Sequence, residues 1–256
     1  MNVLWVLAHP DDRSLNAALH RDGIAELTEQ GHRVEVSDLY AMKWNPVVDR
    51  DDYGRDGDER LLIGSASQKA LDEGTLSPDI RAEQDKLDRA GLVVLQFPLW
   101  WFGMPAILKG WIDRVFIKGY AYSIPDPERT GRSKRYGAGG LAGKRALAVV
   151  TVGADPAGYG PRGIDGPLDD LLFPLLHGTF FYTGMSPLPP VTIYNANHVS
   201  ASGYEAAVAE LRTRLRDAET TAPIPYRTQN GGDYDDRMVL LPDVAPGRTG
   251  LAAHLR

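Results

Sequence analysis

Short apolar segments alternate along the chain with longer stretches in which apolar residues recur at helical spacing. Residues 2–8 form an apolar run that predicts a strand buried on both faces, and residues 33–38 alternate apolar and polar side chains as a second strand does. Between them, Ser14 stands at the N-cap position of a predicted helix that continues through Ile24. A strand, a helix and a strand in this order make a βαβ unit, so the pattern predicts an α/β fold.

The same alternation continues to about residue 220 and predicts one domain. Further strands are predicted at residues 92–97, 145–152 and 191–194, and further helices at residues 78–90, 105–115 and 205–218, with one more starting near Gly166-Pro167. This pattern fits a doubly wound parallel sheet of about five strands with helices on both faces, in three layers. Residues 221–256 carry turn signals and few apolar anchors. We therefore expect a domain at 1–220 and a C-terminal arm at 221–256, packed on the domain or on a dimer partner.

Two long stretches carry no clear periodicity. Residues 43–80 are polar and irregular up to the Ser77-Pro78 pair that opens a helix, and residues 125–143 are rich in Gly, Pro and Arg. Connections of this length are uncommon unless they are functional or packed on a partner. We expect loops at both places.

Composition narrows the class of protein. The 256 residues are 43% hydrophobic and 24% charged, which is typical of a soluble globular chain. The absence of cysteine excludes thiol nucleophiles, Cys-ligated zinc, iron–sulfur clusters and disulfides. A net charge of -6 argues against a nucleic-acid partner. No apolar run is long enough for a membrane span, and a strand follows Met1 directly, so we expect a cytoplasmic protein.

Candidate chemistry lies in three loops that follow predicted strands, because open α/β sheets bind ligands at the carboxyl ends of their strands. The loop from His9 to Asn16 places polar side chains at a helix N-terminus, which suits a phosphate group. By itself, however, this loop is read more simply as a capped helix with a solvated Arg13. His9 taken alone is read as an ordinary loop histidine.

The other two loops leave their interpretation open on residues alone. Residues 98–103 contain two tryptophans and a phenylalanine, which either wall a site for a flat ring or form a hydrophobic plug. Residues 153–166 carry Tyr159 between glycines, and its hydroxyl either donates to developing negative charge or is a surface group.

One alternative follows from the segment Ala8-His9-Pro10-Asp11-Asp12, which resembles the zinc-binding opening of N-acetylglucosamine deacetylases. That family continues with Glu and a Gly-Gly pair, whereas Arg13 and Ser14 follow here. The remaining histidines stand singly and form no His-x-x-His spacing. Both departures count against a zinc hydrolase.

Several segments together resemble the flavin-dependent NAD(P)H:quinone oxidoreductases of the DT-diaphorase type. The matching stretches are residues 37–42, 45–46, 73–80, 82–84, 96–99, 101–111, 114–116 and 121–122. The stretch from Gln96 to Phe116 is long and highly specific. The resemblance covers about residues 1–220 and is weak in the arm.

The resemblance implies a flavodoxin-like homodimer with one FAD per subunit (FMN being the alternative) and an active site at the subunit interface. NAD(P)H would reduce the flavin and leave, and a quinone would then enter the same pocket and take both electrons, in a ping-pong reaction. No resident metal is implied. A second interpretation is a flavoprotein regulatory subunit of a membrane transporter, because the Gly-rich segment 139–144 is similar to bacterial relatives of that kind.

The resemblance also assigns roles to individual residues by position. The cofactor would be held by His9, Arg13, Ser14, Leu15, Asn16, Pro98, Leu99, Trp101, Phe102, Thr151, Gly153, Ala154 and Tyr159. The substrate pocket would be walled by Trp101, Phe102, Tyr122, Ile124 and Tyr182, with Tyr122 coming from the other subunit. Tyr159 and Asp165 would be the catalytic residues, with Tyr159 stabilising the negative charge that flavin reduction creates.

Four positions depart from the family pattern. Asp165 stands where the family has a catalytic histidine, and an ionised carboxylate there would repel an anionic reduced flavin. Asp165 is therefore turned away, protonated, or offset by Arg162. The other departures are Ile124 for a tyrosine, Ala154 for a glycine and Arg13 for a threonine.

Overall fold

A central parallel sheet organises the chain. The computed structural model describes residues 1–54 and 60–256. The strands of the sheet are β1 (Asn2–Leu7), β2 (Arg33–Asp38), β3 (Leu92–Pro98), β6 (Arg145–Thr151), β7 (Ser186–Pro187) and β8 (Val191–Ile193). Their order is β2-β1-β3-β6, and β7 and β8 both pair with β6 at the last position. The predicted doubly wound parallel sheet is confirmed, with two short strands sharing its fifth position.

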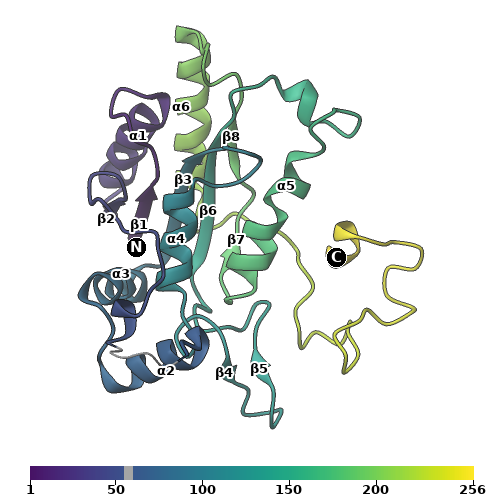
Figure 1. Cartoon of the computed structure of the whole chain (residues 1–256). Coiled ribbons are helices and arrows are strands. Elements are labelled where there is room, and N and C mark those ends of the chain that lie inside the picture. The colour runs from purple at the N-terminus through teal and green to yellow at the C-terminus, as the bar shows by residue number, and fades with distance from the viewer. Residues whose placement is uncertain (55–59) are drawn as a thin grey trace.

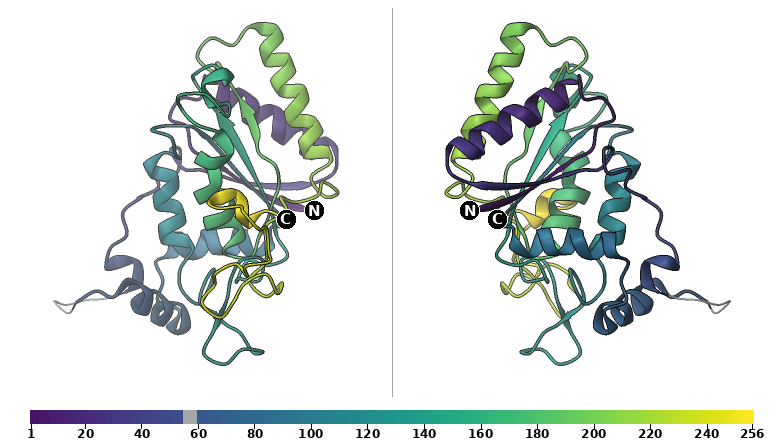
Figure 2. Two further views of the ribbon diagram at one scale, coloured as in Figure 1. Left: turned by 90° about the vertical axis from the view of Figure 1, so that its right-hand side faces the viewer. Right: turned by 90° about the vertical axis from the view of Figure 1, so that its left-hand side faces the viewer.

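Helices cover both faces of the sheet, as Figures 1 and 2 show. On one face lie α1 (Leu15–Glu29) and α6 (Ala201–Arg216), and on the other lie α3 (Pro78–Arg89), α4 (Ala106–Val115) and α5 (Leu168–Leu175). Successive strand residues point to opposite faces, so Trp5 packs in the core under α1 and α6 while Leu4 and Val6 pack in the core on the other side. Three layers follow from this alternation.

The structure corrects the predicted elements at three places. Residues 43–80 are not a continuous loop, because they contain the short 3-10 helix η1 (Asp51–Tyr53) and the helix α2 (Ile63–Glu73). The 125–143 region contains a hairpin of β4 (Ile124–Pro125) and β5 (Ser133–Lys134). Helix α6 begins four residues earlier than predicted, at Ala201.

Each difference has a local reason. The buried face of α2 consists of small side chains such as Ala66 and Ala70, which give a weak apolar signal. Its end is set by Gly74, whose left-handed conformation (φ 71°) lets its amide donate to the carbonyls of Ala70 and Leu71. The first turn of α6 contains Gly203 and depends on the Ser200 side chain, which accepts a hydrogen bond from the Gly203 amide.

The segment after α6 packs against the domain of the same chain. The amide of Ile224 donates to the Pro187 carbonyl (2.8 Å), and the buried Gln229 side chain bonds Ser133 and Arg135 beside the hairpin. The segment ends in the short helix η4 (Leu251–His254), which lies near α5 in Figure 1. In the described part of the chain, no helix is both long and apolar enough to cross a membrane.

Candidate active site

Loops that follow β1, β3, β6 and β8 meet at the carboxyl edge of the sheet, at the top of Figure 1. They enclose a cleft of about 400 Å³. Its lining consists of His9, Ser14, Leu15, Asn16, Pro98, Leu99, Trp100, Thr151, Gly153, Ala196 and Asn197. Eight of the predicted cofactor residues are therefore brought together from three loops far apart in sequence.

The N-terminus of α1 forms one side of the cleft. Ser14 is its N-cap, because Ser14 Oγ accepts a hydrogen bond from the Ala17 amide (3.1 Å) and donates to the Asp11 carbonyl (2.7 Å). The positive end of the helix dipole thus faces the cleft, where it favours an anionic group. Arg13 does not line this cleft: its guanidinium pairs with the Asp11 carboxylate (3.2 Å) and its side chain is 86% exposed. It borders a neighbouring cavity of about 710 Å³ instead.

A buried hydrogen-bond network supports the floor of the cleft. Asn16 Nδ2 donates to Thr151 Oγ1 (2.7 Å), which ties the start of α1 to the end of β6. From β3, Gln96 Nε2 donates to the Asn16 carbonyl (2.7 Å), and the Gln96 Oε1 accepts from Trp5 Nε1 (2.9 Å). Asn16 Oδ1 is buried and has no partner among the described residues. This network fixes the positions of Asn16 and Thr151.

The aromatic loop after β3 is a tight turn. The amide and carbonyl of Trp100 bond the carbonyl and amide of Gly103 (2.9 and 3.0 Å), and Trp101 and Phe102 between them have positive φ values of 49° and 58°. Non-glycine residues rarely adopt this conformation, and such strain gathers at functional sites. Trp101 is 98% exposed and Phe102 is 50% exposed, so the hydrophobic-plug interpretation is wrong.

The amides of this loop differ in their availability. The Leu99 amide donates to the Thr151 carbonyl (2.8 Å), so it is not free to bond a ligand. Within the described residues, the amides of Trp101 and Phe102 donate to no protein group. Two donors and two exposed aromatic rings therefore stand together at the mouth of the cleft.

Gly153 allows the loop after β6 to approach the loop after β8. A Cβ at this position would lie 2.9 Å from Asn197 Nδ2, so the Asn197 side chain would have to move to admit one. Ala154, one residue on, is exposed and accepts a hydrogen bond from the Asn195 amide (3.1 Å). It lies at the same edge but does not line the cleft.

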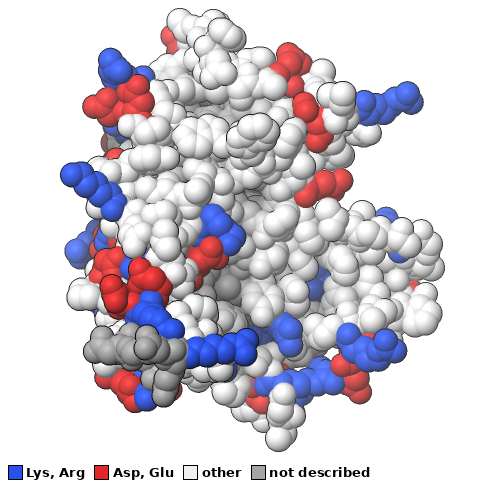
Figure 3. Space-filling model, viewed as in Figure 1, with Lys and Arg blue, Asp and Glu red and all other residues white. Residues whose placement is uncertain are grey.

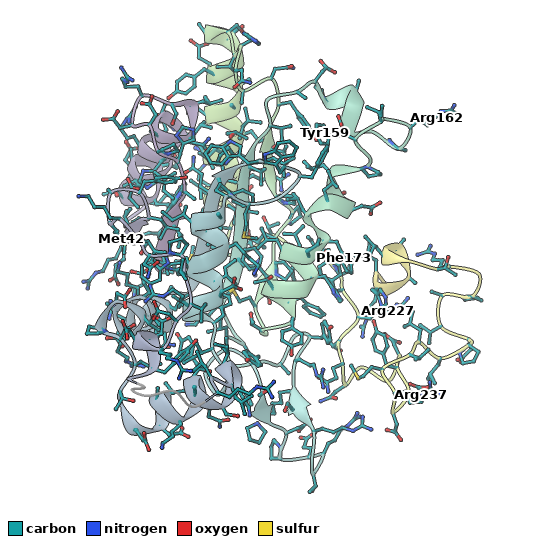
Figure 4. All side chains as sticks on the ribbon, viewed as in Figure 1. Met42, Tyr159, Arg162, Phe173, Arg227 and Arg237 are labelled. Atoms are coloured by element: carbon teal, nitrogen blue, oxygen red, sulfur yellow. The ribbon has the colours of Figure 1, made fainter. Side chains whose placement is uncertain are left out.

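Tyr159 and Asp165 lie farther along the same loop and also do not line the cleft. The Tyr159 ring packs 5.8 Å from the Tyr194 ring. Burial, and then the neighbouring Asp165 carboxylate, raise the pKa of Tyr159, so its hydroxyl remains protonated and able to donate. Figure 4 shows Arg162 pointing away from Tyr159, and no salt bridge joins Arg162 to a described residue. Arg162 therefore forms no direct ion pair with Asp165.

The predicted substrate residues fall into two groups at opposite edges of the sheet. Trp101 and Phe102 follow the carboxyl end of β3, whereas α4 carries the chain back so that Tyr122 and Ile124 lie at the amino edge. Tyr182 lies there too, shortly before β7 pairs with the start of β6. Tyr122 and Tyr182 are neighbours. Burial raises the pKa of Tyr122, and the nearby Tyr182 raises it further. One chain does not assemble the predicted substrate pocket.

Three residues of the site escaped the sequence analysis. Ala196 and Asn197 line the cleft beside Trp100, and Gln96 supports it from below. The rule that ligands bind at strand carboxyl ends applies equally to the loop after β8 and would have indicated Asn197. Gln96 carried a signal as well, because it is the single polar residue in the apolar run 92–97.

The comparisons with known proteins agree with this geometry. The flavodoxin-like fold family matches residues 1–217. The chain is 45% identical to a ribosyldihydronicotinamide dehydrogenase-like protein from Penicillium crustosum, over 100% of this chain and 96% of that protein. It is 36% identical to NAD(P)H dehydrogenase [quinone] 1 from Rattus norvegicus, over 88% of this chain and 80% of that protein. The chain belongs to the flavodoxin-like NAD(P)H:quinone oxidoreductase family.

One solved structure matches this chain over its full length. A protein from Klebsiella pneumoniae, described as a candidate quinone reductase, has 47% identity and a TM-score of 0.96, with 100% of both chains covered. The zinc-deacetylase and transporter-subunit interpretations gain no support from these relatives. In the described residues, no group of three His, Cys, Asp or Glu side chains could hold a metal ion.

Proposed function

We propose that the protein transfers two electrons from NAD(P)H to a quinone through a bound FAD, in a ping-pong reaction. The observation that carries the proposal is the cleft at the carboxyl edge, which brings a helix N-terminus together with the loop after β3. In that loop Trp101 and Phe102 are exposed, and their amides donate to no described residue. The names of the related enzymes support the same reaction class. When bound, the flavin supplies a site that takes up a hydride and passes it on.

The residues present fit a flavin. The N-terminus of α1, capped by Ser14, suits a phosphate group. The Trp101 and Phe102 amides can meet the polar edge of a flat ring, and their side chains can cover its face. The unpartnered Oδ1 of Asn16 is a buried acceptor at the cleft floor. The choice of FAD over FMN follows the family resemblance, and chromatography of the cofactor released by acid distinguishes them.

Tyr159 and Asp165 have opposing effects in this proposal. The protonated Tyr159 hydroxyl donates a hydrogen bond to negative charge that develops beside it. The Asp165 carboxylate, which forms no direct ion pair with Arg162, disfavours the same charge. We infer that Asp165 slows the step that the family's histidine would assist.

We further propose a homodimer in which each active site uses both chains. Trp101, Phe102 and the 99%-exposed Ile164 leave apolar surface uncovered at the carboxyl edge. The aromatic pair Tyr122 and Tyr182 lies at the opposite edge. A two-fold axis that sets one chain's amino edge on its partner's carboxyl edge brings these groups together twice, because such an interface is self-complementary.

Subunit mixing tests both proposals. Trp101→Ala and Tyr182→Ala each damage every site of their own homodimer, so each variant alone should have low NAD(P)H:quinone activity. After random exchange, about half of the dimers are mixed and each has one intact site, so about a quarter of the wild-type activity should return. Mixing without recovery, with exchange verified by mass spectrometry, contradicts the shared site. Intersecting rather than parallel double-reciprocal lines for the wild type contradict the ping-pong reaction.

A further inference from the structure

A second cavity, of about 360 Å³, lies between the C-terminal segment and the α5 region, and it shares no residue with the cleft. Its lining consists of Tyr136, Phe173, Pro174, His177, Gly178, Tyr234, Met238, Leu251 and His254. A volume of this order is within the range of small-molecule sites.

Aromatic rings from three separate segments build the walls. Phe173 of α5 and His177 of the following π-helix η3 (Leu176–Phe181) stack with centroids 4.5 Å apart and planes inclined by 17°. Tyr136, from the stretch after β5, lies 4.9 Å from the His177 ring. The C-terminal segment closes the cavity with Tyr234 and His254, whose hydroxyl and Nδ1 are hydrogen-bonded (2.9 Å). In Figure 4, Phe173 lies on the side of α5 that faces this segment.

His177 has unused hydrogen-bonding capacity inside these walls. The residue is only 9% exposed and lines the cavity, and its imidazole makes no hydrogen bond to any described residue. Burial, and then His254, lower the pKa of His177 to about 4, so the imidazole is neutral at pH 7 and offers one donor and one acceptor. The imidazole nitrogens are therefore available to pair with a polar group that enters the cavity.

The charge of the lining restricts what that partner is. None of the nine lining residues is a carboxylate, an ammonium or a guanidinium group. Basic side chains gather instead on the outer surface over the hairpin and the C-terminal segment, at the lower edge of Figure 3. A charged ligand would lose its hydration without gaining an ionic partner, so the lining favours a neutral one.

We propose that this cavity binds a neutral aromatic molecule of one or two rings that carries a hydroxyl group. Its ring packs among Tyr136, Phe173 and His254, and its hydroxyl bonds the His177 imidazole. Tyr136 also contacts Tyr182 (centroids 5.2 Å apart, edge to face), so the bound molecule lies one ring away from the proposed substrate wall. The site itself does not depend on the proposed function, because its residues do not overlap the cleft.

Calorimetric titration of the flavin-loaded protein with 1-naphthol, and with 1-fluoronaphthalene as the probe without a hydroxyl, tests the proposal. Gly178 lines the cavity and a Cβ there meets no atom within 4 Å, so Gly178→Leu places a bulky side chain at the cavity wall with room for its Cβ. We expect this variant to bind one 1-naphthol fewer per chain. Trp101→Ala, which alters the proposed acceptor pocket, should retain the second site.

His177→Phe keeps the ring and removes the hydrogen bond. Its affinity for 1-naphthol at this site should fall about tenfold, with 1-fluoronaphthalene binding unchanged. A 1-naphthol stoichiometry that Gly178→Leu leaves unaltered overturns the proposal, as does an equal effect of His177→Phe on both probes. Circular dichroism and flavin content establish whether the variants are folded. If His177→Phe does not fold, the Gly178→Leu result decides alone. Loss of 1-naphthol binding only in Trp101→Ala assigns the ligand to the active site and also overturns it.

Discussion

Replacing Gln96 with leucine tests the network that holds the cleft floor. The Gln96 side chain is fully buried, accepts from Trp5 Nε1 at 2.9 Å and donates to the Asn16 carbonyl at 2.7 Å. Leucine has a similar volume, so the substitution removes these two hydrogen bonds without opening a large cavity. Trp5 is also fully buried, so no water can replace its lost acceptor.

The expected loss of stability follows from these two groups. An orphaned buried N–H destabilises by about 1–3 kcal/mol, and the Asn16 carbonyl, which remains in helix α1, loses about 1 kcal/mol. We therefore expect Gln96→Leu to lower the free energy of unfolding by about 2–4 kcal/mol, a large share of the roughly 5–15 kcal/mol of a typical domain.

Urea unfolding followed by circular dichroism measures this change, and a double-mutant cycle assigns it. Trp5→Phe removes the indole N–H, so Gln96→Leu in that background should destabilise by only about 1 kcal/mol. An equal loss in both backgrounds would refute the assignment to the indole hydrogen bond. A loss below about 0.5 kcal/mol in the wild-type background would refute the network as a source of stability.

Three further predictions concern other parts of the site and the core. Asp165→His should raise the rate of flavin reduction in stopped-flow experiments and Asp165→Asn should raise it less; an unchanged rate removes Asp165 from the mechanism. Burial lowers the pKa of His20 and of His177 to about 4 from 6.5, so the unfolded chain binds more protons between these values. Stability should therefore fall as pH drops from 6.5 to 5, by at most about 1.4 kcal/mol per pH unit for each histidine, and His177→Phe should remove one such contribution from the slope. Ser14→Ala should lower the free energy of unfolding by about 1 kcal/mol through the lost N-cap, and a loss no larger than that of an exposed Ser202→Ala control would contradict the cap.

Strands β1, β3 and β6 were predictable because each is a nearly continuous apolar run, as parallel strands buried on both faces must be. Helix α2 was not, because its buried face is made of small residues such as Ala66 and Ala70. Strand β7 is too short to produce a periodic signal, and only its pairing with β6 defines it.

The candidate site, too, was predictable from the sequence only in part. The fold class predicted that loops at strand carboxyl ends would meet, and the family resemblance then assigned Ser14, Asn16 and Thr151 to the cofactor site. The exposure of Trp101 required the structure, because the sequence gives no sign that this turn has positive φ. The separation of Tyr182 from Trp101 also required the structure, because the sequence pattern does not show that the segment before β7 reaches the opposite edge of the sheet.

The absorption spectrum of the purified protein, recorded before and after anaerobic addition of NADH or NADPH, tests the central proposal most directly. We expect a flavin spectrum that bleaches with one or both nucleotides and recovers when a quinone is added. A protein that neither carries flavin nor takes it up when FAD or FMN is supplied would contradict the proposed reaction.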